Sequence, residues 1–235
     1  MLRLRQIALA ASDLAAAEGQ LKAALDLQLC YRDPNVAVFG LKNALFPIGD
    51  QFLEIVSPQQ DGTSAGRLLE RRGDCGYMVL FQVDDLGPVT KRIADAGIRV
   101  VYDAAGEGIR GLHLHPRDVP GAIVSIDAAD QPAEWPWAGR GWREHVRTTT
   151  AHAIVAMEVS VADPLAACAT WSRLLGVSAD GSSLRLDDAT VRFVDPKQCN
   201  GREGIVALDL ATRDPAIRGS TRELLGVSLR FVAGG

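Results

Sequence analysis

The chain has 235 residues, 47% of them hydrophobic, and its formal net charge is −4 at pH 7. That length is enough for one large domain or two small ones with a hydrophobic core. A mildly acidic chain without a basic run argues against nucleic acid and anionic membranes as partners, and no apolar stretch is long enough to span a bilayer. The four cysteines form no CxxC pair, which predicts reduced thiols in a cytoplasmic protein.

The N-terminal part of the chain predicts a strand, a helix and then further strands. Residues 2–11 alternate as in a strand, and Ser12-Asp13 is typical of a helix N-terminus, with the helix expected over about residues 14–25. The next strands are predicted at residues 28–31, 36–41, 43–46 and 51–56. A connection rich in Gly, Ser and charge follows, with a short helix at 65–71.

The strand at 51–56 carries one carboxylate between apolar neighbours. Because side chains alternate along a strand, Phe52, Glu54 and Val56 share a face. A buried carboxylate is unfavourable as a charge, so it has a partner or a raised pKa. The alternative is a glutamate of an edge strand that points into water.

The same order of elements begins again at residue 77. Residues 77–83 predict a strand, and Asp84-Asp85 begins a helix over about 86–96 that Gly97 ends. Three further strands are predicted at residues 99–102, 111–115 and 121–127.

Residues 130–150 interrupt the pattern and hold three of the four tryptophans, Trp135, Trp137 and Trp142. We expect this linker to pack its rings on a neighbouring surface. A stacking platform for a ligand is the alternative, although the interleaved basic residues of a nucleic-acid site are missing.

A third and a fourth start follow the linker. The third predicts a strand at 153–161, a helix from Asp163-Pro164 to Leu175, and hairpin strands at 183–186 and 189–194. The fourth predicts a strand at 205–211, a helix that follows Asp214-Pro215 and ends at Leu225-Gly226, and a last strand at 227–232. The four starts share an aspartate at the helix N-terminus, namely Asp13, Asp85, Asp163 and Asp214. Such an internal repeat indicates a fold that is built from repeated modules.

Four segments match the vicinal oxygen chelate superfamily: QIALAASDL at 6–14, NALFPIGDQFLE at 43–54, VDDL at 83–86 and RDVPG at 117–121. The chain resembles this superfamily, which includes glyoxalase I, bleomycin-resistance proteins, methylmalonyl-CoA epimerase and extradiol dioxygenases. The second segment looks like the glyoxalase-like subfamily. The resemblance covers residues 1–128 better than 150–235, where the fourth module is truncated.

The resemblance implies an α+β fold in which βαβββ modules pair into cup-shaped mixed sheets. It divides the chain into a first cup at 1–128 (modules 1–72 and 73–128), a Trp-rich linker at 129–150, and a degenerate, truncated half at 151–235. We expect this second half to be structural and to bury surface against the first half or against a second subunit, as in a homodimer.

Metal ligands of the superfamily lie on the first and last strands of each module. The first-strand position lies seven residues before the aspartate, and here holds Gln6, Met78, Ala156 and Ala207. The last-strand position holds Glu54, Ser125 and Arg192. Only Gln6 and Glu54 could bind a metal at these positions, with His115 as a third candidate. The resemblance therefore implies no certain cofactor, and a divalent metal would have an incomplete set of ligands.

His113 and His115 lie two apart on one predicted strand and would share a face. In extradiol relatives an acid–base residue lies about ten positions before the last-strand glutamate, where His115 lies relative to Ser125. If that face lines the cup, a His–Glu pair could exchange protons near neutral pH. Two histidines on a solvated strand, hydrogen-bonded near Asp118, are the alternative.

Two functions follow for the N-terminal cup, both with a small oxygenated metabolite as ligand. In the first, an isomerase, epimerase or lyase uses Glu54 as base and His115 as proton donor or relay. In the second, a bleomycin-resistance type of protein binds or sequesters its ligand without catalysis, which the replacements at Met78 and Ser125 favour. The residues expected to contact the ligand are Gln6, Asn43, Phe52, Met78, Gln82, His113 and Ser125.

Overall fold

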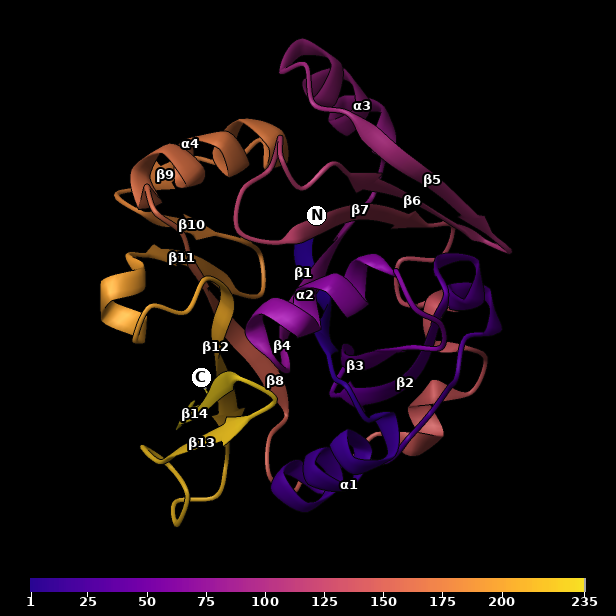
Figure 1. Ribbon diagram of the computed structural model, residues 1–235, viewed down its shortest axis with the longest axis vertical. Helices are drawn as coiled ribbons and strands as arrows, with labels where there is room; N and C mark the ends of the chain where they lie inside the picture. Colours follow the sequence, from indigo (N-terminus) through magenta and orange to yellow (C-terminus); the bar gives the residue numbers. More distant parts are fainter. Residues whose placement is uncertain (235) are drawn as a thin grey trace. The chain divides into compact units, whose positions relative to one another are not determined.

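The computed structural model describes residues 1–234, which fold into two mixed sheets of seven strands each (Figure 1). The strand orders are β2-β3-β1-β4-β7-β6-β5 and β13-β14-β12-β8-β11-β10-β9. The order of a strand, a helix and further strands occurs twice in the first sheet and once in the second, which confirms the α+β class with repeated modules.

The chain divides into two compact units, named here after one residue of each. The Glu54 unit comprises Gln6–Tyr77, Trp137–Val155 and the segment from Ala207 onward. The His113 unit comprises Met1–Arg5, Met78–Pro136 and Ala156–Val206. The four strands β1 (Leu2–Ala10), β4 (Cys75–Val83), β8 (Ala153–Ser160) and β12 (Gly204–Thr212) contribute residues to both units.

The Glu54 unit is built on a parallel pair of strands flanked by a hairpin. Strand β1 runs parallel to β3 (Gln51–Pro58), which pairs antiparallel with β2 (Leu41–Ile48). Gly49, with φ of 59°, forms the tight turn between β2 and β3, and a side chain there would meet the carbonyl of His152. Its other elements are α1 (Leu14–Leu25), η1 (Pro34–Phe39), α2 (Ser64–Arg72), η3 (Trp142–His145), β13 (Thr221–Leu224) and β14 (Val227–Ala233).

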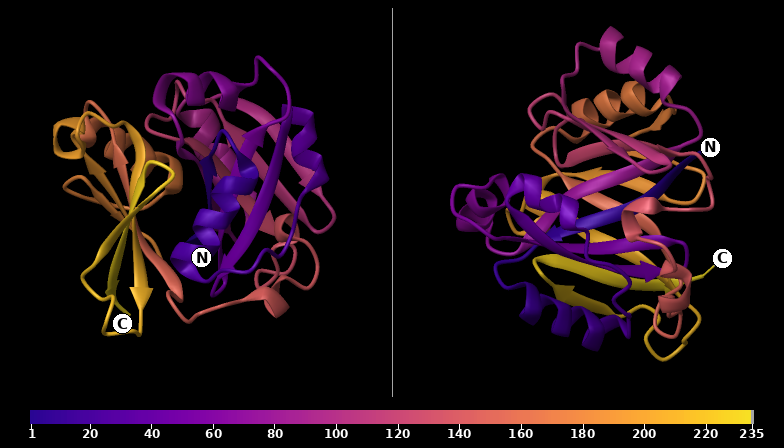
Figure 2. Two further views of the ribbon diagram at one scale, coloured as in Figure 1. Left: turned by 60° about the horizontal axis from the view of Figure 1, so that its bottom comes forward. Right: turned by 90° about the vertical axis from the view of Figure 1, so that its right-hand side faces the viewer.

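The His113 unit contains two sets of strands and two neighbouring helices. The first set is β4, β7 (Ile123–Ala129), β6 (Ile109–Leu114) and β5 (Val100–Gly106); the second is β8, β11 (Thr190–Val194), β10 (Ser183–Arg185) and β9 (Ala179–Asp180). Helices α3 (Leu86–Asp95) and α4 (Pro164–Leu175) lie side by side (Figure 2), and the Arg92 guanidinium donates to the carbonyl of Leu174. The short helix η4 (Pro196–Cys199) completes the unit. Of the short helix η2 (Pro136–Ala138), only Pro136 belongs to it, and the other two residues belong to the Glu54 unit.

Three of the four repeated aspartates begin helices as predicted. The carboxylates of Asp13, Asp85 and Asp163 each accept from backbone N–H groups of the first turn of α1, α3 and α4. Those N–H groups have no partner within the helix, so the aspartate satisfies them.

The helix predicted after Asp214 is wrong. Asp214 accepts a hydrogen bond from the backbone of Ala216, as a capping residue does. However, the chain then turns and enters β13, which forms a hairpin with β14. A helix from Pro215 to Leu225 would have to include Thr221–Leu224. Those four residues form β13 and pair with β14 instead.

Two strands predicted in the first module are also wrong. Residues 28–31 make only an isolated bridge between Tyr31 and Leu45. Residues 34–39 form the short helix η1, because Asp33 accepts from the backbone of Asn35 and Pro34 has the φ that a first helical turn requires.

The tryptophan linker contributes packed rings to each unit, as the packing interpretation predicts. Trp142 is 3% exposed, and its ring meets that of Phe52 edge-on at 4.9 Å within the Glu54 unit. Trp135 is fully buried in the His113 unit, where the Arg5 guanidinium lies 5.4 Å from its ring.

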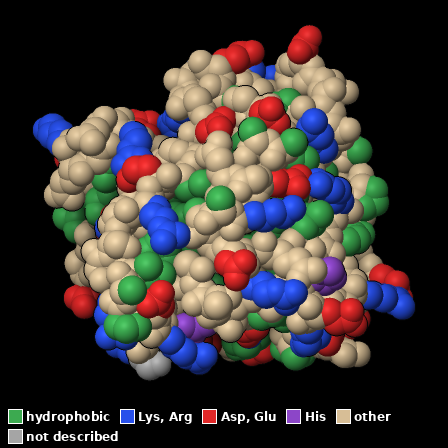
Figure 3. Space-filling view, turned by 90° about the horizontal axis from the view of Figure 1, so that it is seen from below, with side chains coloured by type: hydrophobic (Ala, Val, Ile, Leu, Met, Phe, Trp, Pro, Cys, Tyr) green, Lys and Arg blue, Asp and Glu red, His purple; other side chains and the backbone are tan. Residues whose placement is uncertain are grey.

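The surface is mixed in charge. Figure 3 shows Lys and Arg side chains interspersed with Asp and Glu over the face that it displays, without an extended basic area. Among residues 1–234, no helix has both the length and the apolar character needed to cross a membrane.

Candidate functional site

Strand register places Glu54 among polar side chains. On β1, Ala8 lies beside Glu54 and Gln6 lies beside Phe52. On the other side of Glu54, β2 places Leu45 opposite Glu54 and Asn43 two pairs further along, opposite Val56. Since paired residues point to the same face, Gln6, Asn43 and Glu54 face the same side of the sheet.

Two side-chain amides hold the carboxylate of Glu54. The Gln6 Nε2 donates to Oε2 at 2.8 Å, and the Asn43 Nδ2 donates to Oε1 at 2.6 Å. Glu54 is 7% exposed, so the alternative of a strand glutamate pointing into water is wrong. We call these three residues the Glu54 cluster.

Burial raises the pKa of Glu54 from its ordinary value of 4.5 to about 7. The hydrogen bonds from Asn43 and Gln6 oppose this rise, because they stabilise the charged form, whereas the charge of Asp33 adds to it. A carboxylate has about four acceptor positions, and the two amides occupy one on each oxygen. The group can therefore take up a proton while both amides stay in place.

Asn43 is itself held in one orientation. Its Oδ1 accepts from the backbone N–H of Asp33 at 2.8 Å, so its amide nitrogen must face Glu54. The Arg32 guanidinium donates to its backbone carbonyl at 3.2 Å. Arg32 and Asp33, which precede η1, thus hold in place the Asn43 amide that donates to Glu54.

Phe52, a predicted ligand contact, is fully buried and packs against Trp142. Its ring contributes to the core of the Glu54 unit and covers the sheet near Gln6, its register partner. A ligand role for Phe52 stays a prediction.

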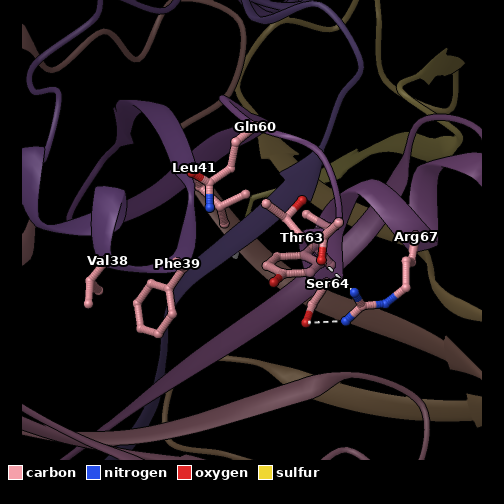
Figure 4. A pocket seen from close by; sticks show the side chains of 10 residues that line it. Val38, Phe39, Leu41, Gln60, Thr63, Ser64 and Arg67 are labelled. Atoms are coloured by element: carbon pink, nitrogen blue, oxygen red, sulfur yellow. Dashed lines mark hydrogen bonds between the residues drawn. The ribbon is translucent and has the colours of Figure 1, made fainter.

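The Glu54 unit also contains a cavity of about 300 Å³ (Figure 4). Its wall comprises Val38, Phe39, Leu41, Gln60, Gly62, Thr63, Ser64, Ala65, Arg67 and Tyr77. Sequence reasoning overlooked Tyr77, whose pKa is raised to about 12 by burial and, second, by the charge of Glu54. The phenol is therefore neutral at pH 7 and electrostatically coupled to Glu54. Its position at the beginning of a core strand gave no signal in the sequence.

In the His113 unit, the register places Ser125 at the position that corresponds to Glu54. Leu80 of β4 lies beside Ser125 of β7, just as Ala8 lies beside Glu54. Ser125 is fully buried, and its hydroxyl has no hydrogen-bond partner among residues 1–234. Met78 lies beside Ile123, and the buried Gln82 donates to the carbonyl of Pro132 at 2.8 Å.

The two histidines do not share a strand. His113 lies on β6 opposite Ser125, with its ring 5.4 Å from that of Tyr102, and burial lowers its pKa to about 4. The strand predicted at 111–115 is present as β6, which ends at Leu114, one residue before His115. Pro116 cannot donate to a ladder, and the carbonyl of His115 instead accepts from Asp118 in a turn.

His115 lies in a small polar cluster of the His113 unit. Its Nδ1 accepts from the backbone N–H of Arg117 at 3.1 Å and lies 3.3 Å from the Arg99 guanidinium. Arg99 forms an ion pair with Asp118 at 2.7 Å, so this arginine already has an anionic partner. The structure thus brings Gln6, Asn43 and Glu54 together, and places His113, His115, Met78, Gln82 and Ser125 in the His113 unit.

A family model described as "Glyoxalase-like domain" matches residues 7–175 of the chain. The chain belongs to this family. The glyoxalase-like fold and its repeated modules also confirm the vicinal oxygen chelate superfamily. None of the curated protein sequences is significantly similar to this glyoxalase-like chain.

Solved structures share the fold at low identity. A hypothetical protein from Staphylococcus aureus is 13% identical with a TM-score of 0.72, and the match covers 98% of this chain and 99% of that one. A methylmalonyl-CoA epimerase is 23% identical with a TM-score of 0.51 over 56% of this chain and 97% of that one. The Streptomyces coelicolor methylmalonyl-CoA epimerase is 23% identical with a TM-score of 0.50, over 55% and 98%. These identities show the fold alone.

Members of the superfamily often use divalent metals, and the side chains around Glu54 do not fit such a site. The cluster offers one carboxylate and two amides, and both carboxylate oxygens already accept hydrogen bonds from the amides. Divalent cations need several oxygen, nitrogen or sulfur ligands arranged around them. Nowhere in the described part of the chain do three or more His, Cys, Asp or Glu residues lie close enough together to hold a metal ion.

Proposed function

We propose that this glyoxalase-like protein abstracts a proton from a carbon next to a carbonyl group, with Glu54 as general base. The observation that carries the proposal is the buried carboxylate of Glu54, which accepts one amide hydrogen bond on each oxygen. The isomerase, epimerase and lyase reactions of carbonyl compounds share this step.

The environment of Glu54 is suited to that step. A base works best when its pKa lies near the working pH, and the pKa of Glu54 is raised to about 7. Gln6 and Asn43 hold the carboxylate in one orientation, so the unused lone pairs point in a defined direction. Carboxylates tuned upward by burial are a recurrent device of proton-transfer enzymes.

The structural neighbours support the reaction class. One structure is a methylmalonyl-CoA epimerase in complex with methylmalonyl-CoA, and variants of the Streptomyces coelicolor enzyme are in complex with 2-nitronate-propionyl-CoA. A nitronate has the charge distribution of an enolate, the product of proton removal beside a carbonyl. We carry over the reaction type to this chain, and not the substrate.

The test is hydrogen exchange in D2O, followed by loss of the α-proton signal in ¹H NMR. The carbon acids are methylmalonyl-CoA, phenylpyruvate and a simple ketone. We expect exchange with at least one of them in the wild type, and a loss of about 100-fold or more in Glu54→Gln. Glu70→Gln, an exposed glutamate of α2 in the same unit, is the matched control and should exchange like the wild type.

Non-catalytic binding is the second candidate, and the replacements at two metal-ligand positions favour it. Met78 and the buried Ser125 stand where relatives of the superfamily place metal ligands. Exchange at equal rates in the wild type and in Glu54→Gln, together with saturable binding of a carbonyl compound, would support the binding protein and contradict the base.

Further parts of the proposal concern partners and location. We keep His115 as a proton relay, to be tested by His115→Gln in the same exchange assay. We propose a cytoplasmic protein, supported by the four free cysteines. A homodimer is proposed as well, and its mass in solution can be measured by light scattering.

A further inference from the structure

Helix α1 carries a buried carboxylate within its apolar face. Leu14, Leu21 and Leu25 are buried at helical spacing, and Glu18 lies on the same face with 8% of its surface exposed. The helix packs against β2 and β3 (Figure 1). A carboxylate in such a place is unfavourable unless it is paired, so Glu18 requires a cationic partner.

That partner is Arg32, which precedes η1. Its two terminal nitrogens each meet one oxygen of Glu18, Nη1 and Oε1 at 2.7 Å and Nη2 and Oε2 at 3.0 Å. A guanidinium that makes two parallel bonds to one carboxylate is held in a defined orientation. Lys22 lies 4.0 Å from the same carboxylate and is exposed, so it is the looser partner.

Arg32 connects this ion pair to β2. Its Nη1 donates to the backbone carbonyl of Asn43 at 3.2 Å, and the next residue, Asp33, donates its backbone N–H to Asn43 Oδ1 at 2.8 Å. Two consecutive residues therefore hold the backbone and the side chain of Asn43, and the first of them is anchored on Glu18. The Asn43 Nδ2 is left to face Glu54, to which it donates at 2.6 Å.

We propose that Glu18 and Arg32 are positioning residues for Glu54, because they hold the Asn43 amide with its nitrogen toward the carboxylate. An amide that is not held in this way can turn over and direct its oxygen at Glu54, since its two ends are nearly equal in size. The inference rests on the proposed function insofar as Glu54 is the base. The orientation of Asn43 can be measured without turnover.

Charge and position predict opposite effects of Glu18→Gln. The charge of Asp33 raises the pKa of Glu54, so removal of a nearby negative charge by itself would lower that pKa or leave it unchanged. Loss of the hydrogen bond from the amide would raise it, because that bond stabilises the charged form. Asp33 and Tyr77, the titratable groups coupled to Glu54, are retained in this variant. The direction of the shift therefore separates positioning by Arg32 from a simple effect of charge.

The experiment follows the Asn43 amide itself. Its side-chain NH2 signal in ¹H–¹⁵N NMR reports the bond to Glu54, and the NH2 signal of Gln6, which donates to the other oxygen, is the internal reference. Each signal is assigned by replacing its residue with Leu. The pKa of Glu54 is measured in the same samples by ¹³C NMR of carboxyl-labelled glutamate. Glu18→Gln and Arg32→Gln are compared with wild type, alone and combined with Asn43→Leu.

Two control variants remove charges that do not reach Asn43. Lys22→Gln removes the looser partner of Glu18, and Arg110→Gln breaks an ion pair of 2.5 Å with Asp103 in the His113 unit. The Arg32 side chain is half exposed, so Arg32→Gln should fold even where Glu18→Gln does not.

We expect Glu18→Gln and Arg32→Gln to shift the NH2 signal of Asn43 and to leave that of Gln6 in place. The pKa of Glu54 should rise by about half a unit to one unit, less than on deletion of the donor, and the pH midpoint of α-proton exchange should rise with it. In the Asn43→Leu background neither variant should move the pKa further. Both controls should behave like the wild type.

Three results would overturn the positioning role: an Asn43 NH2 signal unchanged in both variants, a pKa of Glu54 that falls or stays the same, or an equal shift with and without Asn43. The expected NMR shifts in a protein that exchanges no α-proton would retain the positioning role and contradict the proposed function. Exchange that depends on Glu54, with the Asn43 signal and the pKa unchanged in Glu18→Gln and Arg32→Gln, would do the reverse.

Discussion

Asn43 is predicted to control the basicity of Glu54. Its Nδ2 donates to Oε1 at 2.6 Å and thereby stabilises the charged form. A hydrogen bond to a charged group contributes about 1.5–3 kcal/mol, and one pKa unit corresponds to about 1.4 kcal/mol. Asn43→Leu, which keeps a similar shape without the donor, should therefore raise the pKa of Glu54 by about one to two units above its value of about 7.

The pKa is measured by ¹³C NMR of carboxyl-labelled glutamate, with Glu54→Gln used to assign the signal. Gln51→Leu is the matched control, because Gln51 lies on the same strand and its side chain bonds to the backbone of Ile154. It should lower stability without moving the pKa of Glu54. If Asn43→Leu leaves that pKa unchanged or lowers it, the hydrogen bond does not tune Glu54, and the proposed control of basicity is wrong.

Three further predictions follow from burial and packing. The pKa of Glu54 is about 7 in the folded chain against an ordinary value of 4.5. The wild type should therefore lose about 3 kcal/mol of stability relative to Glu54→Gln as the pH rises from about 4.5 to 7. Urea unfolding at several pH values in that window measures the loss, and free energies of unfolding that change with pH equally in both proteins would contradict it. Trp142→Ala should lower the free energy of unfolding by about 3–5 kcal/mol through lost packing on Phe52, whereas Trp137→Ala, whose ring is less buried, should cost less. His113 should stay neutral down to about pH 4 in an NMR titration. Because the imidazole takes up its proton near pH 6.5 in the unfolded chain, stability should fall as the pH drops from about 6.5 to 4. A titration midpoint near 6.5 would show that the ring is solvated.

Much of the fold could be predicted from local patterns. Asp13, Asp85 and Asp163 mark helix starts because their carboxylates satisfy free N–H groups within the next three residues, which is a local interaction. Asp214 shows the limit of that rule, since it makes the same local bond while a hairpin takes the residues that follow. Tertiary pairing between β13 and β14 overrides the local preference there.

The candidate site divides in the same way between sequence and structure. Strand alternation predicts only that Phe52, Glu54 and Val56 share a face, whereas the resemblance to the vicinal oxygen chelate superfamily is what predicts that Gln6 and Glu54 face the same cup. Their hydrogen bond, and the raised pKa that follows from burial, depend on residues far apart in the chain. Tyr77 and Arg67 could not be found from the sequence, because a cavity exists only where η1, α2 and the beginning of β4 come together. The sequence by itself determined most of the elements and their repetition, because those depend on neighbours in the chain. The tertiary structure decided which polar groups are buried and paired, because burial depends on segments that only the folded chain brings into contact.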